Sequence, residues 1–238
     1  MLNTYLLVHG LFLGGWCWAP VARLLSARGH RVFTPTQTGL GERHHLLSPS
    51  VGIDTFIQDL MNVIEFEELD RVILVGHSFG GMAAAGTADA LPKRIRHLVY
   101  LDGAIPSPGH AFAEQLPENI RTKRLAAAKE INGTRCFLPT DPAQLGISNQ
   151  ETLNWLRRHM TPHPVKTYLD PIQLRRAPEQ GPACTFIRCA NPYYPPANTS
   201  GERAQKIPGW HYREIAASHG CIFLTPHIVA KLLQEIPL

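Results

Sequence analysis

One stretch decides the organisation of this chain: Arg71-Val72-Ile73-Leu74-Val75-Gly76-His77-Ser78-Phe79-Gly80-Gly81-Met82-Ala83-Ala84-Ala85. Its first five residues are largely β-branched and apolar, which predicts a strand buried on both faces. The small residues that follow Phe79 predict a helix packed closely against that strand. The turn between them reads G-x-S-x-G, and Gly76 and Gly80 let strand and helix approach because they have no Cβ. We therefore predict a strained elbow that presents Ser78 as a nucleophile at the carboxyl edge of a sheet.

Length and composition are those of one globular domain. A chain of 238 residues is long enough for a single α/β domain with one core, and 44% apolar with 18% charged residues argues against disorder. The formal net charge of +4 is not concentrated in a Lys/Arg cluster, so we expect a solvated surface and no nucleic-acid partner. No apolar run is long enough to span a membrane, and the first strand begins too early to leave room for a signal peptide.

Histidine and cysteine usage gives no metal signature. The twelve histidines include no H-E-x-x-H or comparable ligand spacing, so we expect no metal site. The five cysteines are odd in number and lack C-x-x-C spacing, which favours reduced thiols in a cytoplasmic protein. Six of these histidines are His44, His45, His159, His163, His211 and His227, and the five cysteines are Cys17, Cys136, Cys184, Cys189 and Cys221.

Strand and helix patterns alternate along most of the chain and predict a mostly parallel sheet covered by helices on both faces. Between residues 104 and 181 the strand-like runs vanish, while proline, polar residues and short helical patches take over. That segment is too long for a loop, so we expect a small helical cap inserted after the strand that ends at Asp102. The predicted domain organisation assigns residues 1–103 and 182–238 to the core and residues 104–181 to the cap. The expected strands are 4–8, 31–34, 71–75, 95–101, 184–189 and 212–217, and the expected core helices include 16–27, 199–206 and 226–236.

The first strand leads directly into His9-Gly10-Leu11-Phe12, followed by two more glycines. Acyl-transfer enzymes of this architecture place part of their oxyanion hole in such a turn, where a backbone N–H is required. We assign the two N–H donors to Leu11 and to Phe79, the residue after the nucleophile. An ordinary strand-to-helix loop is the alternative.

The general base is expected on a loop after the last strand, where Ser218-His219-Gly220 lies. Neutral imidazole can accept the Ser78 proton and return it to a leaving group, so His219 is the predicted base. The acid is less obvious, because the loop after residues 184–189 contains no carboxylate. Asp102 follows a strand directly and is our prediction. Asn191 is the rival, because an amide oxygen could orient the imidazole without a charge.

These residues resemble the α/β-hydrolase superfamily. More narrowly, Leu6-Leu7-Val8-His9-Gly10 with Gly14-Gly15-Trp16-Cys17-Trp18, together with the G-x-S-x-G turn, look like the plant methylesterase and hydroxynitrile lyase family and its bacterial esterase relatives. The resemblance implies a Ser-His-acid esterase or lyase with a small helical cap and no cofactor. Lyases of that family carry threonine and lysine where this chain has Gly10 and Gly220, so it looks like the esterase branch. The family's usual aspartate slot falls near Asn191, where this chain departs from the pattern.

Three functions follow as hypotheses. The first is a serine carboxylic-ester hydrolase that acts on small or medium apolar esters through an acyl-enzyme. The second is lyase chemistry, or hydrolysis of a secondary-metabolite intermediate, at the same site. The third is a non-catalytic small-molecule receptor, against which an intact Ser78 and His219 argue. The sequence leaves open whether the protein forms a homodimer. The residues expected to contact substrate are His9, Gly10, Phe12 and His77 near the nucleophile, and Phe137, Leu138, Trp155 and Tyr168 in the cap.

Overall fold

A computed structural model of the chain describes residues 2–237. Its centre is a six-stranded sheet in the order β2-β1-β3-β4-β8-β9, and every neighbouring pair is parallel. All six strands lie where the sequence predicts them, within a few residues. They are β1 (Thr4–Val8), β2 (Arg31–Phe33), β3 (Val72–His77), β4 (Ile95–Leu101), β8 (Cys184–Cys189) and β9 (His211–Ile215).

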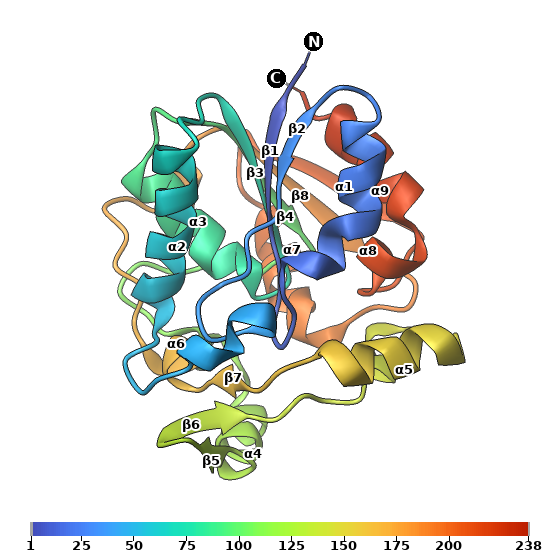
Figure 1. The fold of residues 1–238 in the computed structure, drawn as a ribbon. Helices are drawn as coiled ribbons and strands as arrows, with labels where there is room; N and C mark the ends of the chain where they lie inside the picture. The colour runs from blue at the N-terminus through green and yellow to red at the C-terminus, as the bar shows by residue number, and fades with distance from the viewer. Residues whose placement is uncertain (1, 238) are drawn as a thin grey trace.

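Helices cover both faces of this sheet (Figure 1). On one face lie α2 (Ile53–Phe66) and α3 (Gly80–Ala90), and on the other lie α1 (Ala19–Ser26), α8 (Cys221–Leu224) and α9 (Pro226–Gln234). The strands supply both cores because successive side chains point to opposite faces. Leu74 belongs to the cluster that contains Phe56 of α2, whereas Ile73 belongs to the cluster that contains Val229 of α9. A further helix, α7 (Asn198–Ala204), contributes Ala204 to the α2 side.

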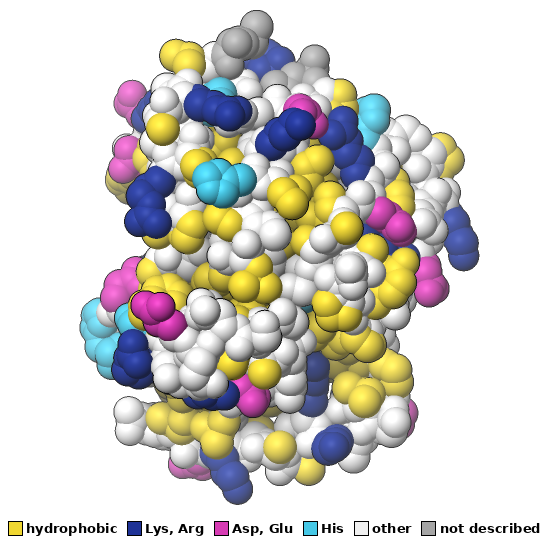
Figure 2. Space-filling view, turned by 90° about the vertical axis from the view of Figure 1, so that its right-hand side faces the viewer, with side chains coloured by type: hydrophobic (Ala, Val, Ile, Leu, Met, Phe, Trp, Pro, Cys, Tyr) yellow, Lys and Arg dark blue, Asp and Glu magenta, His cyan; other side chains and the backbone are white. Residues whose placement is uncertain are grey.

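The chain between β4 and β8 lies at the carboxyl edge of the sheet, while both termini lie at the opposite edge (Figure 1). It contains α4 (Glu118–Ala126), α5 (Gln150–His159) and α6 (Lys166–Leu169). It also contains an antiparallel sheet of β5 (Lys129–Ile131), β6 (Thr134–Phe137) and β7 (His163–Pro164). In the space-filling view of Figure 2, hydrophobic side chains are interspersed with charged and other polar ones over the face shown.

The expectation that strand-like runs vanish from this segment is therefore wrong. The strands are short, and β5 is largely exposed, so they lack the apolar pattern by which buried strands are recognised. A local signal for the hairpin was nevertheless present. Asn132 and Gly133 connect β5 to β6 with φ of 48° and 74°, and an Asn-Gly pair favours such a tight hairpin turn. Within residues 2–237, no helix has the length and apolar character needed to cross a membrane.

Candidate active site

Ser78 lies on a sharp elbow between β3 and α3. Its φ of 55° is in the left-handed region, which costs energy for a residue with a Cβ. Hydrogen bonds from its neighbours hold the strained residue: the Ser78 N–H donates to Leu101 O, and the Ala104 N–H donates to Ser78 O. Glycine is required on both sides. A Cβ on Gly76 would lie 2.7 Å from Gly81 Cα, and one on Gly80 would lie 2.5 Å from His9 O.

A continuous chain of hydrogen bonds joins Ser78, His219 and Asp102. His219 Nδ1 lies 2.6 Å from Asp102 Oδ2, and His219 Nε2 lies 2.9 Å from Ser78 Oγ. The side chains of His219 and Asp102 are 3% and 2% exposed. Because an ionised carboxylate only accepts hydrogen bonds, Nδ1 carries the imidazole proton, and Nε2 is free to accept the Ser78 hydroxyl proton.

Asp102 reaches the imidazole from the end of β4, one strand beyond the elbow. Its own φ is 47°, and its N–H donates to Ile187 O on β8 at 2.7 Å, so the backbone that carries the carboxylate is fixed. The second carboxylate oxygen, Oδ1, accepts the Cys189 N–H at 3.3 Å. Asn191, the rival, is exposed, and its backbone N–H donates to Ala217 O. Thus Asp102, and not Asn191, occupies the hydrogen-bonding position beside His219 Nδ1.

Aromatic rings contact the His219 imidazole. Tyr194 stacks on it with ring centroids 3.9 Å apart and an interplanar angle of 19°. The His77 ring lies 4.8 Å away, and its Nε2 donates to the His219 backbone oxygen at 3.0 Å. Both rings restrict the imidazole to an orientation that faces Ser78. Tyr194 was not among the residues predicted from the sequence.

The turn after β1 lies directly against the nucleophile. A Cβ on Gly10 would be 2.9 Å from Ser78 Cβ, so only glycine fits without displacement. His9 is fully buried and holds the turn from below: its Nε2 accepts the Gln37 N–H, and its Nδ1 donates to Gly10 O at 2.9 Å. His9 thus supports the turn, and it is not among the residues that line the three cavities around Ser78.

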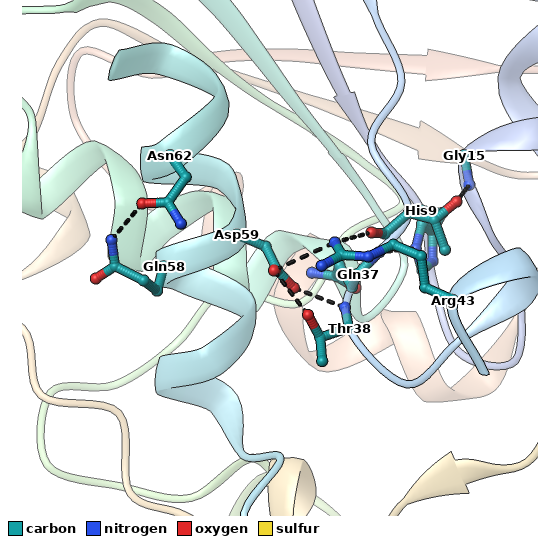
Figure 3. A network of polar contacts seen from close by, with 9 residues as sticks. His9, Gly15, Gln37, Thr38, Arg43, Gln58, Asp59 and Asn62 are labelled. Carbon is teal, nitrogen blue, oxygen red and sulfur yellow. Dashed lines mark hydrogen bonds and ion pairs between the residues drawn. The ribbon is translucent and has the colours of Figure 1, made fainter. Parts of the chain in front are cut away.

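A polar network extends from this turn to α2 (Figure 3). Asp59 of α2 accepts both the N–H and the hydroxyl of Thr38 and forms an ion pair with Arg43. Thr36 accepts the Gly15 N–H at 2.7 Å. The loop after β2 is therefore fixed both to α2 and to the segment that follows Gly10, which supports a rigid turn beside Ser78.

The Leu11 and Phe79 N–H groups are available to an incoming atom. Within residues 2–237, neither donates a hydrogen bond to another group of the protein. Both residues line one cavity together with Ser78 and His219. Two free backbone donors beside a nucleophile are the arrangement that stabilises a developing oxyanion.

Three buried histidines near Ser78 are electrically neutral. Burial lowers the pKa of His9 to about 4, and it lowers those of His77 and His163 to about 3. His163 Nε2 donates to Thr167 Oγ1, and its ring lies edge-on to Phe12, Phe56 and Phe79. These neutral rings add no positive charge around the nucleophile. Of the histidines near Ser78, His219 is the one hydrogen-bonded to Ser78 Oγ and can accept the hydroxyl proton.

Three adjoining cavities open around Ser78 and share Leu11 and Tyr194 in their walls. One of these cavities contains Ser78, Phe79 and His219 in its wall. Of the residues predicted to contact substrate, six line these cavities: Gly10, Phe12, His77, Phe137, Leu138 and Tyr168. The structure thus brings residues from the segment between β4 and β8 to the same site as the nucleophile.

Trp155 does not line these three cavities. It lies on α5 and packs against Trp16, His159 and Phe223. That Trp155 contacts substrate stays a prediction, because an amphipathic helix does not reveal from its sequence which structure its apolar face covers. The wall instead includes Arg124, Phe112 and Thr140, which the sequence analysis missed. No sequence motif marks them.

In the described part of the chain, no group of three or more His, Cys, Asp or Glu residues is arranged to hold a metal ion. All five cysteines are buried and free.

Comparison with known proteins identifies the family. Residues 5–232 match the group described as the alpha/beta hydrolase family, so the chain belongs to that family. A carbendazim-hydrolysing esterase from Nocardioides sp. (strain SG-4G) is 33% identical over 243 residues, which cover 99% of this chain and 100% of that protein. Relatives named as esterases support a hydrolase enzyme of the carboxylesterase type.

Plant relatives match over a shorter range. Methylesterase 9 of Arabidopsis thaliana is 33% identical over 129 residues, which are 52% of this chain and 50% of that protein. Among solved structures, an extracellular alpha/beta-hydrolase from a Paenibacillus species superposes with a TM-score of 0.86 at 19% identity and covers 98% of both chains. This structural likeness supports the shared fold.

Proposed function

We propose that this protein is a serine carboxylic-ester hydrolase with Ser78, His219 and Asp102 as its catalytic triad. The observation that carries the proposal is the buried chain of hydrogen bonds from Asp102 through His219 to Ser78, which ends at a cavity wall. We also propose residues 104–181 as the cap and the rest of the chain as the core.

In the proposed mechanism, Ser78 Oγ attacks the ester carbonyl carbon while His219 Nε2 accepts the hydroxyl proton. The Leu11 and Phe79 N–H groups stabilise the negative oxygen of the tetrahedral intermediate. Its collapse breaks the bond to the alcohol, which leaves with the proton from His219 Nε2, and the acyl group stays on Ser78. Water then attacks the acyl-enzyme with His219 as its base, and the carboxylic acid is released.

The cavity walls favour a small or medium ester with apolar parts. Half of the residues that line the cavity beside the catalytic one are apolar: Leu11, Phe12, Ala127, Phe137 and Leu138. Burial of apolar substrate surface there would provide binding free energy that does not depend on the reacting bond. The esterase names of the relatives agree with this class of substrate.

The test is Ser78→Ala, which removes the nucleophile and leaves the backbone unchanged. We expect turnover of p-nitrophenyl butyrate to fall by several orders of magnitude. A fluorophosphonate probe should label the wild type at Ser78 and should not label the variant. Ser50→Ala is the matched control, because Ser50 is an exposed serine hydrogen-bonded to Ser48 and away from the cavities.

Wild-type rates in a folded Ser78→Ala variant would refute the mechanism. A wild-type protein that neither turns over esters nor reacts with the probe would instead fit the receptor hypothesis.

A further inference from the structure

Arg124 is the charged side chain in the cavity walls that the triad does not use. It comes from α4 and lines the catalytic cavity together with Ser78 and His219. It also lines the adjoining cavity, in which the other residues are all uncharged. One guanidinium therefore borders both the reacting atoms and the apolar space beside them.

Arg124 is held by a buried phenol. Its Nη1 donates to Tyr168 Oη at 2.7 Å, and Tyr194 lines the same two cavities as the guanidinium. Tyr168 is 2% exposed and packs against Phe79, Phe112 and Phe137, so the anchor that orients Arg124 is rigid. The guanidinium is thus preorganised at the wall of the cavity.

The charge of Arg124 has no carboxylate partner in the described part of the chain. Other arginines, such as Arg121 on the same helix, form ion pairs with carboxylates, but none of the ion pairs within residues 2–237 includes Arg124. A guanidinium has five N–H donors in a planar fork that matches a carboxylate, and the Tyr168 phenol does not neutralise its charge. A half-buried, unpaired cation at a binding cavity would be complemented by an anionic group on the ligand.

We propose that Arg124 is a specificity-determining residue that binds a carboxylate on the ester substrate. The proposal rests on the proposed esterase function and refines its substrate class: monoesters of dicarboxylic acids whose apolar linker lies along Phe12, Phe137 and Leu138. The free carboxylate contacts Arg124 while the ester carbonyl lies at Ser78.

Three methyl esters of similar length test this proposal. Monomethyl glutarate carries a carboxylate at the far end, methyl 5-oxohexanoate carries a neutral ketone there, and methyl hexanoate carries only carbon. Methanol release gives kcat/KM for each ester. We expect the wild type to prefer monomethyl glutarate over methyl hexanoate, with the ketone ester between them.

Arg124→Met should lower kcat/KM for monomethyl glutarate about tenfold or more, mainly through KM, because a charge-assisted hydrogen bond is lost. The kcat/KM for methyl hexanoate should fall much less than that for monomethyl glutarate, and the circular dichroism spectrum of the variant should match that of the wild type. Arg124→Lys keeps the charge but loses the planar fork, so we expect a smaller loss. Lys123→Met is the matched control: it removes the same charge from an exposed neighbour on α4 and should leave the preference unchanged.

If Arg124→Met lowers kcat/KM for monomethyl glutarate and methyl hexanoate by the same factor, the proposal is overturned. Arg124 would then act only as a support for Tyr168. A wild type that prefers methyl hexanoate would also overturn it, with the esterase function intact. If the wild type hydrolyses none of the three esters and no p-nitrophenyl butyrate, the esterase function itself fails.

Discussion

Asp102→Asn replaces one carboxylate oxygen by an NH₂ group and preserves the shape of the side chain. Both oxygens have fixed partners in the protein: Oδ1 accepts the Cys189 N–H, and Oδ2 accepts His219 Nδ1–H. An amide has only one oxygen, so it can accept only one of these hydrogen bonds. If it accepts from Cys189, its NH₂ group faces His219 Nδ1. That ring nitrogen must then become an acceptor, and the imidazole proton moves to Nε2.

An imidazole protonated on Nε2 cannot take the Ser78 proton. In the alternative rotamer the amide oxygen points toward His219, and the NH₂ group faces the Cys189 N–H. Two donors then face each other at a side chain that is only 2% exposed, which is unfavourable. The wrong tautomer is therefore favoured. In the best-studied triad the same change lowers kcat about 10⁴-fold, which corresponds to about 5 kcal/mol of transition-state stabilisation.

The assay is the initial rate of p-nitrophenyl butyrate hydrolysis by the wild type, Asp102→Asn and Asn191→Ala. We expect a loss of about 10³- to 10⁴-fold for Asp102→Asn, with KM nearly unchanged because the acid does not touch substrate. Asn191→Ala should remain close to the wild-type rate, since Asn191 is exposed. A nearly silent Asp102→Asn together with a damaging Asn191→Ala would refute the assignment of the acid.

Two further predictions concern stability and reaction type. In the unfolded chain histidine binds a proton below about pH 6.5, whereas folded His9, His77 and His163 stay neutral down to about pH 3–4. The free energy of unfolding should therefore fall as the pH drops through this window. The loss at pH 5 is up to about 6 kcal/mol for the three rings. Denaturant unfolding followed by circular dichroism should show this difference between pH 7 and pH 5 and a smaller one in His163→Gln; equal stability at both pH values would contradict it. We also expect negligible release of cyanide from mandelonitrile, because Gly10 and Gly220 provide no side chain that could hold the cyanohydrin hydroxyl or stabilise the departing cyanide. Rapid cyanide release would place the chain on the lyase branch.

The elements that could be predicted from the sequence are those whose signal is local. Strand β3 and the elbow follow from a run of apolar residues and from glycines at two positions where the backbones approach within contact distance. Asp102 directly follows the buried strand β4 and His219 lies on the loop after β9, so both belong to the carboxyl edge of the parallel sheet. The sheet order then brings β3 and β4 together and makes the hydrogen bond from Asp102 to His219 feasible.

The residues that escaped prediction depend on contacts between distant segments. Tyr194 follows β8 in a proline-rich loop, and only the folded chain shows that its ring stacks on His219. Arg124 lies in a helix with no buried residue, where the pattern predicts a solvated surface. It is instead anchored by Tyr168, a residue 44 positions away. The segment between β4 and β8 contributes no strand to the central sheet, so no periodic pattern of that sheet constrains it. The substrate selection that we propose for Arg124 therefore depends on the part of the chain whose sequence carries the weakest structural signal.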